Sequence, residues 1–167
     1  MRTETTTRTL YKYGELTEEA KQHAIEKLYD INVDHEWYQF TYEDAENIKL
    51  KINGFDIDRA SYVKAEFMES APETAELIVI GHGKECETYK TAKAFLNTLN
   101  EITGKHQNIE DAPEEEIEEA EEEFLKSLCE DYRIMLTKEY EYLTGKEAII
   151  ETIEANEYEF TEDGDLA

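Results

Sequence analysis

Three stretches of the chain alternate at every second position, as β-strands do. The first covers residues 3–13, the second covers residues 60–68, and a short third one includes Tyr158 and Phe160. Most of the alternating side chains are β-branched or aromatic, which suits a pleated, half-buried surface. In the first two stretches they are Thr5, Thr7, Thr9, Tyr11 and Tyr13, then Ser61, Val63, Ala65 and Phe67. The pattern predicts about three strands.

The segment between the first two predicted strands repeats its apolar residues every three or four positions, which predicts helices. Thr17 suits the N-cap of a helix that runs to about Ile31. Asp34 suits the cap of a second helix, which we expect to end near Gly54. The expected inward face of this second helix consists of Trp37, Phe40, Ala45 and Ile48.

Three later helix starts share one local pattern, a capping oxygen placed three residues before a glutamate. The pattern occurs at Ser70, Asp111 and Thr144, and the first two copies also carry a proline in the first turn. It predicts helices that begin near residues 71, 112 and 145. The apolar run Leu77–Ile80 then belongs to a short helix.

One more helix, over about 86–103, completes the pattern, and the helix that begins near 112 is the longest, over 112–143. The element order implies an α+β fold, with a small antiparallel sheet of about three strands packed against five to six helices, one of them long. We interpret residues 1–167 as a single acidic domain, with residues 104–112 as the candidate hinge. The long helix carries one apolar stripe made of Ile117, Ala120, Phe124, Leu128, Tyr132, Leu136, Tyr140 and Leu143.

The charge of the chain changes this picture. Its 42 acidic residues face 17 basic ones, for a formal net charge of −25, while 40% of the residues are hydrophobic. A disordered acidic tail would lack so many apolar residues, so the charge belongs to a folded protein. Such a charge repels nucleic acid and anionic membranes and attracts basic proteins. With two cysteines and no apolar run at the N-terminus, we expect a cytoplasmic protein.

The acidic residues are concentrated near the start of the long helix. From Glu110 to Glu123, ten of the fourteen residues are acidic and none is basic. Because the apolar stripe takes one side of this helix, we expect the glutamates to face solvent and to form a partner-binding face. Its members are Glu114, Glu115, Glu118, Glu119, Glu122 and Glu123. A second acidic patch is expected from Glu154, Glu157, Glu159, Glu162 and Asp163.

Motifs that carry chemistry are missing from the sequence, so we expect no enzyme, cofactor or metal site. There is no glycine-rich phosphate loop, zinc-protease pair or nucleophile elbow. A thiol site would need His82 or His106 beside Cys86, but a single His-x3-Cys pair is half a metal site at best. Asp56 and Asp58 lack the further ligands of a calcium loop.

Four segments, Leu16–Glu26, Glu36–Ala45, Lys138–Thr144 and Ile153–Gly164, resemble a family of small acidic proteins. Bacteriophages, prophages and plasmids carry that family, which has no established activity. The C-terminal motif is the most specific part of the match. The central part of the chain differs from the family pattern, because many relatives have a segment rich in glycine, serine and aromatic residues where this chain has residues 58–67.

The resemblance implies an accessory protein of a mobile element in a bacterial host cell. Such acidic proteins often block restriction or CRISPR nucleases, as DNA mimics or by masking a basic channel. Our first hypothesis is therefore an inhibitor of a host nucleic-acid-binding defence protein. The alternative is a structural or adaptor module, for example a homodimer, that binds through aromatic side chains such as Tyr38, Tyr42, Tyr62, Tyr89 and Tyr158.

Overall fold

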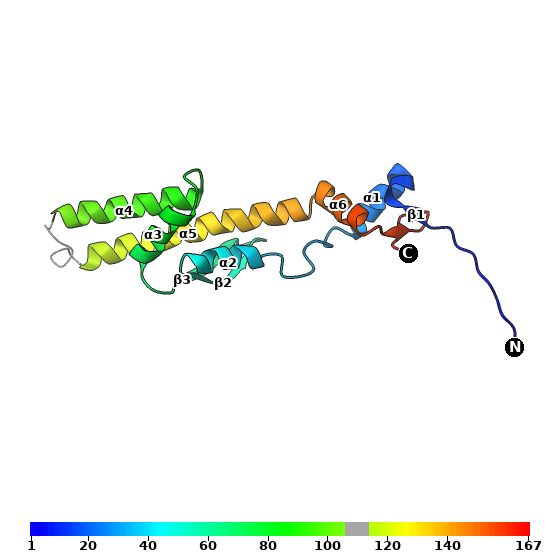
Figure 1. The fold of residues 1–167 in the computed structure, drawn as a ribbon, viewed down its shortest axis with the longest axis horizontal. Helices are drawn as coiled ribbons and strands as arrows, with labels where there is room; N and C mark the ends of the chain where they lie inside the picture. The colour runs from blue at the N-terminus through cyan, green and yellow to red at the C-terminus, as the bar shows by residue number, and fades with distance from the viewer. Residues whose placement is uncertain (106–113) are drawn as a thin grey trace. The chain divides into compact units, whose positions relative to one another are not determined.

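The computed structural model describes residues 1–105 and 114–167, and it has the predicted α+β fold dominated by helices (Figure 1). The helices are α1 (Glu18–Lys27), α2 (Gln39–Asn47), α3 (Ala71–Gly81), α4 (Glu87–Lys105), α5 (Glu114–Leu143) and α6 (Lys146–Ala155), with a short 3-10 turn, η1 (Tyr13–Glu15). The strands are β1 (Tyr11–Lys12), β2 (Leu50–Asp56), β3 (Tyr62–Phe67) and β4 (Glu159–Phe160). They form two separate antiparallel pairs, β1 with β4 and β2 with β3, instead of one sheet.

Contacts along the chain divide it into two compact units. The central unit is Tyr38–Lys138, and the terminal unit combines Met1–Trp37 with Glu139–Ala167. Our interpretation of residues 1–167 as one domain stays a prediction. The candidate hinge at 104–112 lies mostly outside the described residues.

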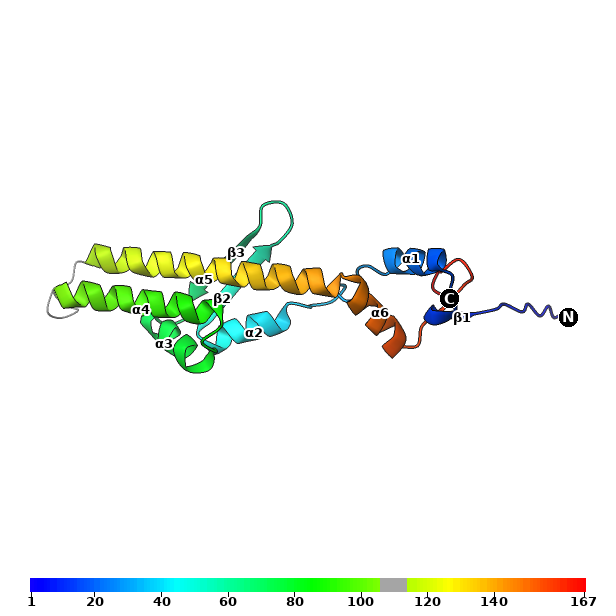
Figure 2. The same ribbon diagram turned by 90° about the horizontal axis from the view of Figure 1, so that it is seen from above.

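The core of the central unit is built around an aromatic stack. Phe124 of α5 lies flat on Phe95 of α4, with ring centroids 4.3 Å apart, and also stacks on Phe67 of β3 at 5.6 Å. The helices α4 and α5 run side by side in both views (Figures 1 and 2). Phe124 is only 2% exposed, so the stack sets which side of α5 faces inward.

The second helix was predicted to be too long, because the residues expected at its end form strand β2 of the β2–β3 hairpin. Lys49 has a φ of 61°, a left-handed conformation that ends α2 before the chain continues as β2. Leu50 and Ile52 are buried and Lys51 is exposed, which is the alternation of a half-buried strand. The predicted inward face of that helix is also partly wrong, because Phe40 is 84% exposed.

Two predicted N-caps are confirmed and two are wrong: α2 has Tyr38 instead of Asp34 at its N-cap, and α6 begins close to the predicted residue 145 but without the Thr144 cap. The Thr17 and Ser70 side chains accept hydrogen bonds from backbone N–H groups three residues on, as N-caps do. At the last helix, Gly145 occupies the N-cap position of α6. The Thr144 hydroxyl instead donates backward to the Tyr140 carbonyl at 2.8 Å. The predicted cap at Asp111 lies outside the described residues.

The terminal unit has its own core, made by α1, α6 and the β1–β4 pair. Its buried side chains include Leu16, Ile149, Ile153 and Phe160. The predicted strand over residues 3–13 is largely wrong, because β1 covers only Tyr11–Lys12. A strand needs a partner for its backbone groups, and β4 offers only two residues for pairing.

Candidate functional site

The first ten residues of α5, Glu114–Glu123, form the strongest charged feature of the described chain, and we call them the acidic segment. Eight are glutamates and none is basic. At about 100° per residue, Phe124 and Ile117 share the inward side of the helix, and Glu115, Glu118 and Glu122 lie on the opposite side. All six predicted face residues are exposed, namely Glu114, Glu115, Glu118, Glu119, Glu122 and Glu123.

Burial and a neighbouring charge act together on one carboxyl of the acidic segment. The carboxyl of Glu121, half-buried beside the apolar stripe, has its pKa raised by burial and next by the charge of Glu118. Both effects disfavour the charged form of Glu121. The charge of Glu118 thus adds to the effect of burial on Glu121.

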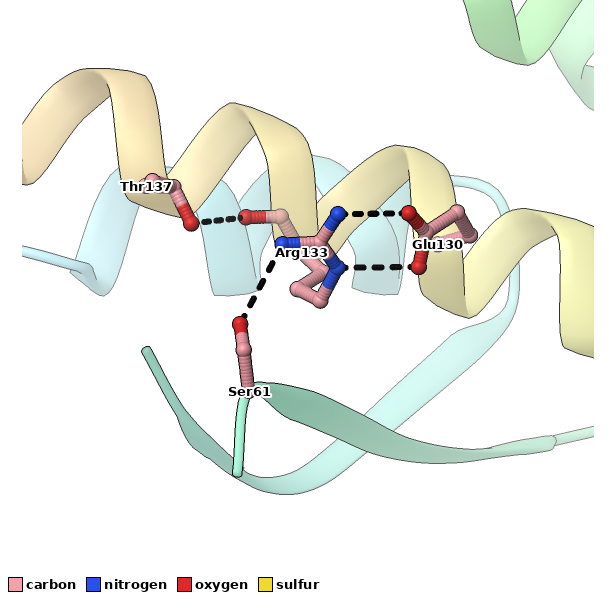
Figure 3. Close-up of polar contacts among 4 residues, drawn as sticks. All are labelled: Ser61, Glu130, Arg133 and Thr137. Carbon is pink, nitrogen blue, oxygen red and sulfur yellow. Dashed lines mark hydrogen bonds and ion pairs between the residues drawn. The ribbon is translucent and has the colours of Figure 1, made fainter. Parts of the chain in front are cut away.

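Beyond the acidic segment the charges become mixed. Lys126 follows on α5, and further along the Arg133 guanidinium forms a two-point ion pair with Glu130, with its Nε 2.9 Å from the carboxylate (Figure 3). Arg133 also donates to the Ser61 hydroxyl at 3.2 Å, which ties α5 to the end of the hairpin loop before β3 (Figure 3). Lys90 and Lys93 are exposed on the neighbouring helix α4. The run of α5 that carries only negative charge thus ends at Glu123.

The second predicted patch belongs to the terminal unit and is less uniform. Its five members are exposed, but Glu159 forms an ion pair with Lys12 at 3.6 Å. The Lys12 ammonium also donates to the Glu157 backbone carbonyl at 2.9 Å. A lysine therefore interrupts this patch.

Part of that second patch lines a shallow hollow of about 360 Å³. Glu162 and Asp163 lie there with Glu19, and the His23 ring nitrogen is 2.7 Å from an Asp165 carboxylate oxygen. The hollow therefore contains a histidine–carboxylate contact as well as further acids. The sequence did not predict that contact, because its two residues are 142 positions apart.

The arrangement around His82 does not favour thiol chemistry. Its Nδ1 lies 2.6 Å from the Thr88 hydroxyl and its Nε2 lies 3.5 Å from an Asp44 carboxylate oxygen. Both ring nitrogens are thus engaged by groups other than Cys86, so the imidazole is not positioned as a base for the thiol. His106, the other proposed partner, lies outside the described residues.

Asp44 extends this network into the core. The buried Tyr132 hydroxyl donates to its second oxygen at 2.9 Å. The His82 hydrogen bond, and to a smaller extent the one from Tyr132, lowers the pKa of Asp44 against the effect of its burial. Burial and the Asp44 charge raise the pKa of Tyr132. The network was not predicted, since Asp44 and Tyr132 are 88 positions apart and no local pattern joins them.

Metal ligation finds no support among the described residues, where no three His, Cys, Asp or Glu side chains are placed to hold one ion. The Asp56 carboxylate accepts a hydrogen bond from the Asp58 backbone N–H at 2.8 Å, which is an Asx turn. That contact explains the Asp-x-Asp pattern as loop structure.

The five tyrosines proposed as contact residues belong to both units and differ in exposure. Tyr38 and Tyr42 pack with Phe55, with centroids 5.0–6.1 Å apart. Tyr62 is 41% exposed, whereas Tyr158 packs against the core of the terminal unit. The fifth, Tyr89, is half-buried on α4. Most of these rings therefore contribute to packing.

Comparison of the chain with protein-family models, with curated proteins and with solved structures found no match. Within the part of the chain that the structure describes, no helix is both long and apolar enough to cross a membrane.

Proposed function

We propose that this protein is an inhibitor that docks on the basic nucleic-acid channel of a host defence protein, a restriction or CRISPR nuclease. The acidic segment of α5 is the leading edge of the contact. The observation that carries the proposal is its uniform charge, with eight glutamates on a rigid helix and no base among them.

The geometry of the acidic segment supports mimicry of a phosphate row. Side chains three or four apart on a helix lie about 5–6 Å from each other. Phosphates along one strand of duplex DNA are spaced at about 3.4 Å of axis, and both rows are regular lines of negative charge. A groove of arginines and lysines that binds one row also attracts the other.

Solubility alone is a weaker explanation of the charge. A net charge of about 2–8 keeps a domain of this size soluble, far below the −25 of this chain. Like charges three or four apart on a helix also oppose folding. Keeping them together costs stability, which a partner that binds the charge would offset.

The proposal is tested by capturing partners from bacterial host lysate at low and high salt, and then repeating the binding with the purified partner. Three charge reversals, Glu118→Lys, Glu119→Lys and Glu122→Lys, should abolish capture. A control triple with the same change in net charge, Glu69→Lys, Glu85→Lys and Glu101→Lys, should retain most of the binding, because these exposed acids lie outside the acidic segment.

The purified pair then distinguishes mimicry from docking elsewhere on the partner. If the protein occupies a nucleic-acid channel, adding DNA should displace it and the partner's DNA binding should fall in proportion to the complex formed. Simultaneous binding of DNA and this protein, or equal binding by the reversed and control triples, would rule the proposal out.

A further inference from the structure

A second hollow lies in the central unit, where α3 ends and α4 begins beside α5. Its volume is about 420 Å³. It differs from the acidic segment because it combines carboxylates with apolar side chains in a concave surface. Its walls include Asp44, His82, Glu87, Asp131, Ile134 and Met135.

The polar side of this hollow is negative. Asp44, Glu87 and Asp131 face it, and Lys138 is the basic residue in its lining. Three carboxylates against one ammonium leave a charge of −2 when His82 is neutral. Glu87 also pairs with Lys90 on its own helix at 3.2 Å, so the two aspartates are the stronger candidates for binding a cation.

Both aspartates are oriented by the fold and retain accepting capacity. The Tyr132 hydroxyl and the His82 ring hold Asp44, and the Thr91 hydroxyl donates to Asp131 Oδ2 at 2.6 Å. A carboxylate has about four lone-pair sites. Tyr132 and His82 occupy two of these sites on Asp44, and Thr91 occupies one on Asp131. Both carboxylates can therefore accept further hydrogen bonds from a ligand in the hollow.

The apolar side suits an alkyl chain. Ile134 and Met135 line the hollow from α5, and Met135 is 40% exposed. A ligand with a cationic head and a short apolar stem would match both walls.

We propose that this hollow binds an alkylguanidinium group, the chemistry of an arginine side chain or of a small free guanidine. The planar guanidinium presents five N–H donors that fit two separated carboxylates, and its weak hydration suits a half-apolar site. A divalent metal fits less well, since the described residues place no three ligands together. This inference does not depend on the acidic segment or on the function proposed for it.

The test is a titration of the full-length protein with butylguanidinium, followed by the backbone amide NMR signals of its glycines. The chain has seven glycines, of which Gly81 and Gly83 line the hollow. Saturable shifts of these two signals, with the other glycines as internal controls, are expected. Butylurea, which has nearly the same shape without the charge, should not produce them.

Two variants change the charge of the hollow in opposite directions and should change the affinity for butylguanidinium in opposite directions. Asp131→Asn keeps an oxygen for Thr91 and should weaken binding about tenfold or more, because it removes a charged acceptor. Lys138→Gln should tighten binding by removing the opposing cation. Glu101→Gln, an exposed change on α4 outside the lining, should leave the affinity unchanged.

An acetylated, amidated arginine separates the two sources of the ligand. If it binds as butylguanidinium does, an arginine side chain of a partner is supported, and if only butylguanidinium binds, a small free guanidine is supported. Equal shifts with butylurea, unsaturable shifts, or unchanged affinity in Asp131→Asn would overturn the proposal.

Discussion

The acidic segment should make the protein less stable than it would be without that charge. Its eight glutamates form eight pairs spaced three or four residues apart on one helix. Every one of these pairs includes Glu118 or Glu119. The double variant Glu118→Gln, Glu119→Gln therefore removes all of them, while glutamine keeps the side-chain length and a similar helix propensity.

The size of the effect follows from the pair count. A like-charge pair on a helix costs about 0.2–0.5 kcal/mol, so eight pairs set an upper limit of about 2–4 kcal/mol. Because these side chains are exposed and partly screened, we expect the double variant to gain about 1–2 kcal/mol at low ionic strength. At 1 M salt the Debye length of about 3 Å is shorter than the spacing of the charges, so most of the gain should vanish.

Urea unfolding at about 0.01 and 1 M salt measures the gain, and amide hydrogen exchange of residues 117–123 shows whether it is local to α5. The matched control is Glu69→Gln, Glu101→Gln, two exposed acids of the central unit that form no like-charge pair within one helix, because Glu69 precedes α3 and Glu101 has no acid three or four places away on α4. No gain in the test variant, a gain that is independent of salt, or an equal gain in the control would refute the reasoning.

Three further changes test the fold and its polar network. Phe124→Ala should cost about 3–5 kcal/mol in urea unfolding, because it empties the centre of the aromatic stack. Gly164→Ala should lower the melting temperature of the terminal unit, since Gly164 has a φ of 89° and a Cβ there would lie 2.2 Å from the Ala20 carbonyl oxygen; an unchanged melting temperature would contradict the close approach. Asp44→Asn should weaken stability at neutral pH by about 1 kcal/mol, because it removes the charged acceptor of His82. Since the folded state lowers the pKa of Asp44, this contribution is present above the unfolded pKa and is lost as the pH falls through the folded pKa. The difference between wild type and Asp44→Asn should therefore shrink in acid, and a constant difference would show that the charge is not its source.

Most of the helices could be predicted because the residues that start a helix and the residues that form its apolar stripe are close together in the sequence. The N-cap at Ser70 and the apolar stripe around Phe124 each depend on residues within a few turns. The alternation over 60–68 correctly predicted β3. These features needed no knowledge of distant contacts.

The errors arose where a distant partner or a single backbone angle decides the structure. The alternating threonines before Tyr11 have strand propensity, but β4 is too short to pair with them. The left-handed conformation at Lys49 turned the end of a predicted helix into β2. The alternation of buried Leu50 and Ile52 around Lys51 was the available signal for that strand.

Of the two candidate sites, one could be predicted from the sequence and the other could not. The exposure of the acidic segment followed from helical periodicity, because the apolar stripe fixes the opposite side of α5. The hollow beside α3 could not be predicted, since Asp44, His82 and Asp131 come from three separate helices or helix ends. Only tertiary packing brings them to one cavity.

The most direct test of the proposed function is the association rate constant of this protein with its purified partner, measured as ionic strength is raised. Docking of the acidic segment in a basic channel predicts a rate that falls steeply with salt for the wild type and much less steeply for the Glu118→Lys, Glu119→Lys, Glu122→Lys variant. A rate that is independent of salt, or the same salt dependence in both proteins, would contradict the account.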